Sequence, residues 1–314
     1  MNKPLYLSDN YRPNDNYNFC STPGRISSKV EFYNDSGELI WEPLHNKTVI
    51  AGSALTAMKL FDLDRNVLDA TPTYDTVLNL DRPAGMGVNT YPVVEVKNQS
   101  GSVFSHADET QRKIIGFCVG QGGAGIDISD VFDVKYCDWI MPDNLIPFKY
   151  PLANADDVDE SMYKGKKTLT LHDGSKRVAY YFKAFSNSPN LVQNYVSTIG
   201  SFSDSVSPST VYTKRGEANM AQSYVELHLK ITNTDCREFF ITHKGLENAK
   251  INQISLISGW ETTVSVEKLD KTGSRVVRDY QYFRDIRPFS LINIPNEIIS
   301  ERSKSISCIY TLYF

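Results

Sequence analysis

Short runs of alternating apolar and polar residues, separated by turn-forming residues, recur along most of the chain. Such alternation indicates strands with one buried face, because successive side chains on a strand point to opposite sides. The pattern is densest in the last third of the sequence. The strands predicted there are Tyr224–Ile231, Glu238–Ile241, Gln253–Ile257, Thr263–Glu267, Arg275–Tyr280 and Ser305–Phe314.

Two hairpins are marked by turn residues between alternating runs. Ser28–Tyr33 and Glu38–Trp41 flank Asn34–Gly37, whose residue types tolerate a positive φ. Thr168–Leu171 and Arg177–Phe182 flank an Asp-Gly turn in the same way. The sequence therefore predicts an antiparallel hairpin at each place.

A single helix is predicted near residues 52–62, because apolar residues recur there at helical spacing. These residues are Ala54, Leu55, Met58, Leu60 and Phe61. Two further strands are predicted. Lys113–Gly120 is short, apolar and ended by glycine, and Lys135–Met141 is stopped by Pro142.

Together these elements predict a mainly β fold, with a sandwich or jelly-roll-like body, one short helix and long loops. Residues 1–26, rich in Asn, Asp, Pro and Tyr, are predicted to form an extended N-terminal arm. Residues 27–314 then form a single β-sandwich body with irregular insertions at about 62–112 and 142–222. Within the second insertion, the Ser/Asn/Thr-rich stretch 186–222 is expected to be a long loop.

Composition narrows the class of partner. The 314 residues carry 33 Lys and Arg against 37 Asp and Glu, giving a formal net charge of -4. A dedicated nucleic-acid binder usually shows a basic excess, so no direct contact with nucleic acid is expected. No apolar stretch approaches the roughly 18 residues needed to span a bilayer. The first residues lack the apolar core of a secretory signal, and no membrane partner is expected.

The five cysteines predict neither a disulfide framework nor a zinc site. They are odd in number, far apart and without a Cys-x-x-Cys pair. We expect reduced, mostly buried thiols, as in a chain made in a reducing cytoplasm. The five are Cys20, Cys118, Cys137, Cys236 and Cys308.

Gly120–Gly125 matches the G-x-G-x-x-G pattern of dinucleotide sites and follows a predicted strand. Such a site also needs a helix that opens at the third glycine, so that the helix N-terminus faces the pyrophosphate. Here Ile126–Val134 is rich in β-branched residues and Asp, and Asp127 would bring negative charge to the phosphates. We therefore interpret the glycines as a turn between strands and predict no cofactor.

Two acidic segments are interpreted as loops rather than cation sites. Asp62–Asn66 begins like a calcium loop, but Val67 and Thr73 occupy the positions that need Gly and a bidentate Glu. The acidic run Asp156–Glu160 is typical of a solvated loop. No metal site is predicted.

No catalytic motif is recognisable, and the chain is predicted not to be an enzyme. One alternative is a glycoside hydrolase on a β fold, which needs two carboxylates about 5–10 Å apart in a cleft, but the sequence nominates no pair. Another is a carbohydrate- or receptor-binding β-sandwich module, which exposed aromatic residues would favour. Trp41, Trp139 and Trp260 are most simply core or interface anchors, and their burial would count against that module.

Both ends of the chain carry candidate interface residues. Tyr6, Tyr11 and Tyr17 lie in the predicted arm, where each offers apolar area and a hydroxyl group for docking on a neighbouring subunit; a frayed terminus is the alternative. The last strand is apolar up to Phe314, so we expect it to be paired within a sheet. No catalytic, cofactor-binding or metal-binding residue is predicted.

The order of these elements resembles that of a group of tailed-bacteriophage virion proteins, which often begin with a hairpin followed by a helix. Gly24–Tyr33 and Lys47–Phe61 stand in those places, and Ile114–Gly125 supplies a strand that ends in a glycine-rich turn. Phe283–Ser290 and the final strand Ser305–Phe314 resemble the way in which these proteins close. The resemblance covers about half of the chain.

This resemblance implies a structural component of the neck, tail or baseplate that assembles through subunit contacts, with a capsid decoration protein as the nearest alternative. The implied partners are other virion proteins and further copies of the chain in a ring or trimer. The implied location is the virion, after synthesis in the cytoplasm of the host bacterium. Strand addition and arm exchange suit such a role, because main-chain hydrogen bonds tolerate variable side chains.

Overall fold

The structure is a computed structural model that describes separate segments of the chain. The predicted N-terminal arm, the predicted helix near residues 52–62 and the predicted strand Lys135–Met141 lie outside the described residues, so these predictions stay untested. The described segments are residues 27–40, 47–48, 73–82, 93–97, 100–108, 111–121, 145–155, 158–197, 200–204, 220–269, 273–298 and 305–313.

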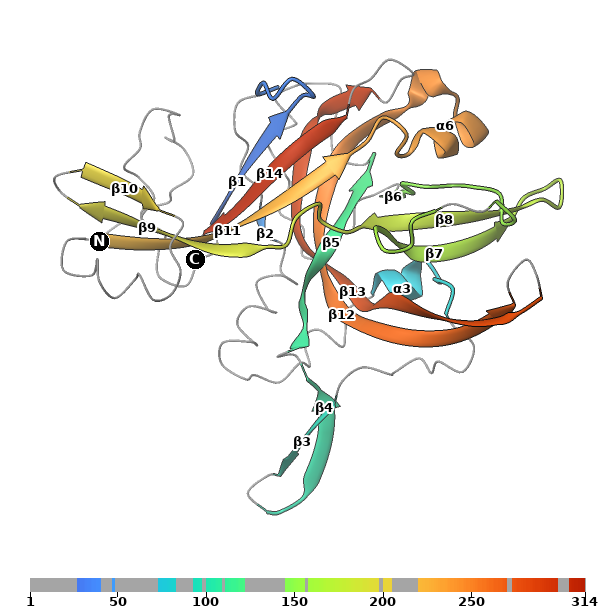
Figure 1. Cartoon of the computed structure of the whole chain (residues 1–314), viewed down its shortest axis with the longest axis horizontal. Coiled ribbons are helices and arrows are strands. Elements are labelled where there is room, and N and C mark those ends of the chain that lie inside the picture. Colours follow the sequence, from blue (N-terminus) through green and yellow to red (C-terminus); the bar gives the residue numbers. More distant parts are fainter. Residues whose placement is uncertain are drawn as a thin grey trace, which may run out of the picture.

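The first sheet contains five antiparallel strands. In spatial order they are β1 (Ser27–Tyr33), β14 (Ile306–Tyr313), β11 (Met220–Ile231), β9 (Asn190–Ser197) and β10 (Gly200–Asp204). β14 lies between β1 and β11 and pairs with both (Figure 1). The prediction that the last strand is paired within a sheet is therefore confirmed for residues 306–313.

The second sheet is also antiparallel. In spatial order its strands are β2 (Lys47–Thr48), β13 (Arg275–Ile298), β12 (Lys250–Leu269), β5 (Lys113–Gly120), β8 (Lys176–Lys183) and β7 (Tyr163–Thr170), with β6 (Leu145–Ile146) also paired to β5. β3 (Val93–Lys97) and β4 (Val103–Ala107) form a separate two-stranded ribbon. The β7–β8 hairpin and the strand β5 confirm two of the sequence predictions.

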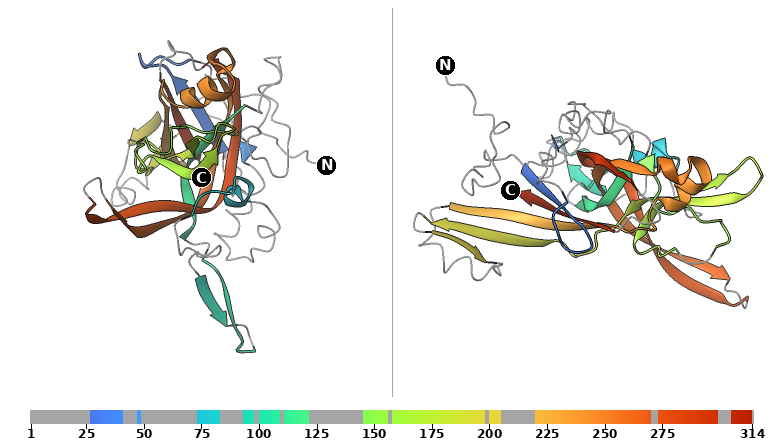
Figure 2. Two further views of the ribbon diagram at one scale, coloured as in Figure 1. Left: turned by 90° about the vertical axis from the view of Figure 1, so that its right-hand side faces the viewer. Right: turned by 90° about the horizontal axis from the view of Figure 1, so that it is seen from above.

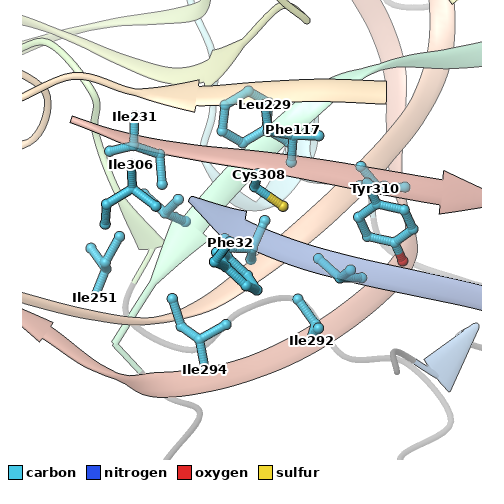
Figure 3. Packing of buried hydrophobic residues seen from close by; sticks show 14 of the residues in the cluster. Phe32, Phe117, Leu229, Ile231, Ile251, Ile292, Ile294, Ile306, Cys308 and Tyr310 are labelled. Carbon is cyan, nitrogen blue, oxygen red and sulfur yellow. The ribbon is translucent and has the colours of Figure 1, made fainter. Parts of the chain in front are cut away.

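The two sheets face each other across an apolar core, so the predicted mainly β, sandwich-like fold is confirmed. The first sheet contributes Phe32, Leu229 and Cys308, and the second contributes Phe117 and Ile292 (Figure 3). Within β1, β11 and β14 the buried apolar side chains fall at every second position. This period is the one that the sequence displays, and it is expected for strands with one face on a core.

A smaller apolar cluster lies on the other face of the second sheet. It is centred on Tyr74 of the short helix α3 (Tyr74–Val77), whose ring makes an edge contact with Phe182 of β8 at 5.5 Å between centroids. Cys118 belongs to this cluster although its neighbour Phe117 faces the core between the sheets, as alternation along β5 requires. The second sheet is therefore covered by side chains on both faces.

The first predicted hairpin forms its turn, but the described part of its second strand, residues 38–40, forms no continuous strand. Gly37 has a φ of 77°, and the Asn34 side-chain oxygen accepts hydrogen bonds from the N–H groups of Ser36 and Glu38, each at 2.9 Å. Beyond the turn, Leu39 makes an isolated bridge to β1. The continuous partner of β1 is β14, because that pairing also completes the inner face of the first sheet.

The predicted strand at Glu238–Ile241 is wrong, because these residues belong to the helix α6 (Arg237–His243). A short apolar run does not distinguish a strand from a helix by its pattern alone. Cys236 has a φ of 63° and starts the helical turn, and the Phe239 ring then lies 4.9 Å from the His243 ring. Contacts between residues four apart belong to a helix.

Regions that were expected to be irregular also contain regular elements. The first predicted insertion includes α3 and the β3–β4 ribbon, and the predicted loop 186–222 includes β9, β10 and the start of β11. Along β9 the apolar residues stand in adjacent pairs, Leu191–Val192 and Tyr195–Val196, so they do not alternate with polar ones, whereas the pairing of the strand uses main-chain groups. The strands predicted at Gln253–Ile257 and Thr263–Glu267 are parts of the single strand β12.

Candidate functional site

Three β elements project beyond the sandwich (Figure 1 and Figure 2). They are the outer part of the β12–β13 hairpin, the β3–β4 ribbon, and β9 and β10 with the start of β11. We call residues 261–269 and 275–283 the β12–β13 arm. A two-stranded ribbon without a covering layer is at best marginally stable alone, and natural proteins keep exposed strand edges short or covered. These projections are therefore the parts of the chain best suited to contact other molecules.

The β12–β13 arm leaves the sandwich at a bend specified on both strands. The two strands shift register beside Gly259. A Cβ atom at this glycine would lie 2.8 Å from the Arg284 carbonyl oxygen and 2.9 Å from Ile115 Cδ1, so no side chain fits there. On β13, Asp285 has a φ of 46°, a conformation in which Asp is several-fold enriched among residues other than glycine.

Two buried arginines hold the conformation of Asp285. Arg112, just before β5, donates to the Asp285 carbonyl oxygen at 2.8 Å and forms an ion pair with its carboxylate. Arg287 donates to the same carboxylate from Nε at 3.1 Å and from Nη2 at 3.0 Å. Both arginines are almost fully buried. A charge in such a place is costly unless it is paired, so these contacts strongly favour one geometry of the bend.

Trp260 connects the bend to the second ribbon. The Arg112 guanidinium carbon lies 4.0 Å from the centroid of the buried Trp260 ring, within range of a cation–π interaction. The Trp260 Nε1–H group donates to the Asp108 carbonyl oxygen at 3.0 Å. Asp108 directly follows β4, so one tryptophan joins the bases of the β3–β4 ribbon and the β12–β13 arm.

The helix α3 holds the same bend from a third direction. An oxygen of the Asp75 carboxylate accepts a hydrogen bond from the Ile286 N–H group at 2.7 Å. Burial raises the pKa of Asp75 to about 6; the Ile286 N–H group opposes this change, and the nearby charge of Asp285 adds to it. We call Asp75, Arg112, Trp260, Asp285 and Arg287 the hub.

A second buried polar cluster joins the two sheets away from the hub. Asp235 accepts hydrogen bonds from Lys183 at 2.6 Å, from Tyr163 at 2.8 Å and from the Thr232 N–H group at 2.8 Å, and Lys149 lies 3.2 Å away. Burial alone would raise the pKa of Asp235, but the charge and hydrogen bond of Lys183 outweigh this and lower it. The carboxylate thus stays ionised and fully bonded, which suits a structural connection between β8 and the loop after β11.

The interface residues predicted from the sequence, Tyr6, Tyr11, Tyr17 and Phe314, all lie outside the described residues, so the structure brings none of them together. The same is true of Trp41, Trp139 and the calcium-like segment Asp62–Asn66. Trp260 is buried beneath Arg112 and offers no exposed face for a sugar. Its burial removes one of the three tryptophans that a carbohydrate-binding module could use.

The described part of the glycine-rich segment is tied to the protein itself. Gln121 donates to the carbonyl oxygens of Asn248 and Lys250 at 3.2 and 2.8 Å, and its side-chain oxygen accepts from Lys244 at 2.6 Å. Asn248 ends the 3₁₀ helix η2 (Leu246–Asn248). The rest of the predicted glycine turn lies outside the described residues.

The described members of the acidic run make local contacts. Asp159 accepts from the N–H and hydroxyl groups of Ser161, at 2.9 and 2.5 Å, and these hydrogen bonds lower its pKa. Glu160 accepts from Lys166 and Tyr180. Within the described segments, no group of three or more His, Cys, Asp or Glu side chains is placed to hold a metal ion.

The described cysteines match the prediction of buried thiols. Cys118, Cys236 and Cys308 are free and buried, and burial raises the pKa of the Cys118 thiol to about 12. Such thiols are inert, because the thiolate is the reactive form. Cys20 and Cys137 lie outside the described residues.

Sequence reasoning missed the hub. Most of its members are far apart in the sequence and they belong to no motif. Charge does not single out Asp285 and Arg287 either, because four other charged residues precede them on the same strand. No helix of the described segments has the length and apolar character needed to cross a membrane. No protein family model, curated protein or solved structure matches this chain.

Proposed function

We propose that this chain is a structural component of a bacteriophage particle that assembles through subunit contacts at the neck, tail or baseplate. The order of its sequence elements, which resembles that of tailed-phage virion proteins, supports the class of particle. The observation that carries the assembly role is the pair of projecting ribbons whose bases meet at one buried hub. Capsid decoration would use the same surfaces and remains the nearest variant of the proposal.

The hub supports an assembly role because it orients the ribbons before a partner arrives. Arg112, Trp260 and Asp285 are linked by hydrogen bonds and a stacked ring, so the two ribbon bases form one unit. Association costs less conformational entropy when the contact surfaces are already ordered. A free hairpin arm held in one direction is therefore well suited to repeated, identical contacts between subunits.

Shortening the β12–β13 arm tests this proposal. Replacing residues 264–280 by Asn-Gly joins the paired residues Thr263 and Gln281 through a two-residue hairpin turn. The shortened chain should keep the thermal stability of the body but fail to enter particles made by the phage that encodes it. Mass spectrometry of purified particles measures incorporation, with the full chain as control. Absence of the full chain from those particles would overturn the virion role, and full incorporation of the shortened chain would overturn the role of the arm.

The predicted N-terminal arm offers an independent test. Deleting residues 1–22 should weaken assembly without unfolding the body, if Tyr6, Tyr11 and Tyr17 dock on a neighbouring subunit. Incorporation is measured in the same particles, and circular dichroism reports whether the body stays folded. Unchanged incorporation of the truncated chain would remove these three residues from the interface.

A further inference from the structure

Within the part of the chain that the structure describes, the β12–β13 arm has a free strand edge. Among the described residues, 275–280 pair with β12 on one side, and β2 pairs with β13 only at Ser290 and Leu291. Near the base of the arm, the Lys164 ammonium group donates to the Gln281 carbonyl oxygen at 3.3 Å, so the uncovered stretch begins beyond that point. An edge of this kind presents N–H and C=O groups that can pair with another strand.

Three side chains alternate along this edge. Arg275, Val277 and Asp279 occupy every second position of β13, which places them on one face of the arm. Val277 is 66% exposed, the highest value among the large hydrophobic residues that the structure describes. The Arg275 side chain is 77% exposed and reaches Glu267 at 3.5 Å, while Asp279 is exposed and accepts from Ser265 Oγ at 2.5 Å. All three side chains can thus be reached from solvent.

The sequence of positive, apolar and negative side chains is complementary to itself. If two copies of β13 pair antiparallel around a two-fold axis at Val277, Val277 of one chain faces Val277 of the other chain. Arg275 of each chain then faces Asp279 of the other, so two ion pairs flank one apolar contact. Directly opposed side chains in an antiparallel pair have Cβ atoms about 4.5–5.5 Å apart, close enough for these contacts. Two-fold contacts of this kind are the commonest in homo-oligomers.

We propose that two copies of this chain associate by pairing their β13 strands, antiparallel and edge to edge, around Val277. The two arms then form one continuous four-stranded sheet. A second copy fits this edge better than an unrelated protein, because Arg275 and Asp279 supply each other's partner charges. The inference rests on the proposed assembly role, since it names the partner of the arm, but dimerisation can be measured on the purified full chain alone.

Charge exchange tests the pairing. Arg275→Asp places like charges opposite each other on both sides of the axis, and so does Asp279→Arg. Each single variant should therefore raise the dimer dissociation constant by roughly tenfold or more, measured by analytical ultracentrifugation. The double variant Arg275→Asp/Asp279→Arg restores opposite charges and should dimerise like the unaltered chain. An equimolar mixture of the two single variants should also dimerise, because every opposed pair is then oppositely charged.

The charge exchange has a clear negative outcome. The proposal is overturned if the unaltered chain is monomeric at high concentration. It is also overturned if the double variant and the mixture bind no better than the single variants. Circular dichroism of each single variant, measured alone, shows that it is folded, so that a failure of the mixture to dimerise reports on the pairing and not on misfolding.

Cysteine cross-linking tests the position of the axis. With Val277→Cys, the two thiols face each other across the axis at a Cα separation within the range of a disulfide. Glu267→Cys is the matched control, because Glu267 lies directly opposite Val277 on β12, is exposed, and is away from the shared edge. Mild oxidation should give several times more covalent dimer from Val277→Cys than from Glu267→Cys. Equal yields would overturn the proposed pairing.

The two proposals fail in different ways. A monomeric chain that is still found in purified particles would remove the β13 dimer and leave the virion role intact. A chain that dimerises through Val277 but is absent from particles would remove the virion role and leave the β13 dimer intact.

Discussion

The core between the two sheets and the hub at the base of the β12–β13 arm are both buried, but they consist of different kinds of side chain. Between the sheets, apolar side chains such as Leu229 and Phe117 pack against one another. In the hub, guanidinium, carboxylate and indole groups are held by directed contacts. Apolar packing is non-directional and tolerates changes of shape, whereas a buried charge network depends on one arrangement. We infer that both regions contribute to stability and that the hub also sets the direction of the arm.

The largest effect is expected from Arg112→Met. This change keeps an unbranched apolar side chain next to Trp260 but removes one of the two guanidinium groups that bind Asp285. Breaking a buried ion pair by removing one partner typically costs about 3–5 kcal/mol, and we expect the free energy of unfolding to fall by that amount in urea titrations. Lys176→Met on the exposed end of β8, away from the proposed dimer edge, is the control and should change stability little. A loss as small as that of the control would show that the hub depends on packing rather than charge.

A comparable but smaller loss is expected from Leu229→Ala in the core. Removal of a buried leucine side chain leaves a cavity and should cost about 3 kcal/mol, whereas Leu229→Met should cost less than about 1.5 kcal/mol. Unlike the hub variant, neither change should open the structure locally at the Ile286 amide, which bonds to Asp75. In Leu229→Ala the protection of this amide should therefore fall by no more than the global free energy of unfolding falls, and a larger fall would contradict the separation of core and hub.

The hub should also respond to pH, whereas the apolar core should not. The pKa of Asp75 rises from 3.8 to about 6 on folding, so the native state binds this proton more tightly than the unfolded state does. The free energy of unfolding should therefore fall by about 3 kcal/mol in total as pH rises from about 3 to about 7, and then stay level. Asp75→Asn, which is neutral throughout and retains an acceptor oxygen, should lose this slope. It should be more stable than the unaltered chain at pH 8 and similar at pH 4, and an unchanged slope would assign the pH dependence to another group.

The smallest effect is expected one residue along the chain from Arg112. Lys113 forms an ion pair with Glu261 at 2.8 Å, but its side chain is largely exposed. Exposed ion pairs contribute less than about 1 kcal/mol and are screened by salt, so Lys113→Ala should barely lower the unfolding midpoint. Arg112 and Lys113 carry the same charge and differ in burial. If Lys113→Ala lowered the free energy of unfolding as much as Arg112→Met does, burial would not explain the importance of Arg112.

The sequence predicts the core better than the hub for a physical reason. A strand with one face on the core shows a period of two, and that period located β7, β8, β11 and β14, whereas β5 was predicted from its short apolar run. The hub leaves no period, because each member comes from a different part of the chain and is recognised only by its contacts. In the sequence, Asp75 and Arg112 cannot be distinguished from exposed charged residues; only their contacts with β13 in the structure identify them.

The remaining errors also have physical causes. β9 pairs through its main chain, and its apolar residues do not alternate with polar ones, so the prediction of a loop failed. The two phenylalanines of α6 are compatible with a strand or with a helix. The helix begins after Cys236, whose left-handed backbone conformation is uncommon for cysteine and could not be expected from the sequence. The predicted interface residues Tyr6, Tyr11, Tyr17 and Phe314 stay predictions.

The pairing of β1 with β14 has a kinetic consequence. It sets Phe32 opposite Cys308, so most of the chain lies in the loop that this contact closes. The entropy of loop closure grows only slowly with length, but contacts distant in sequence slow folding strongly. The local β7–β8 and β12–β13 hairpins should form first, and the first sheet should complete last. Until then the inner face of the second sheet is exposed to aggregation, so slower synthesis at lower temperature should increase the yield of folded protein.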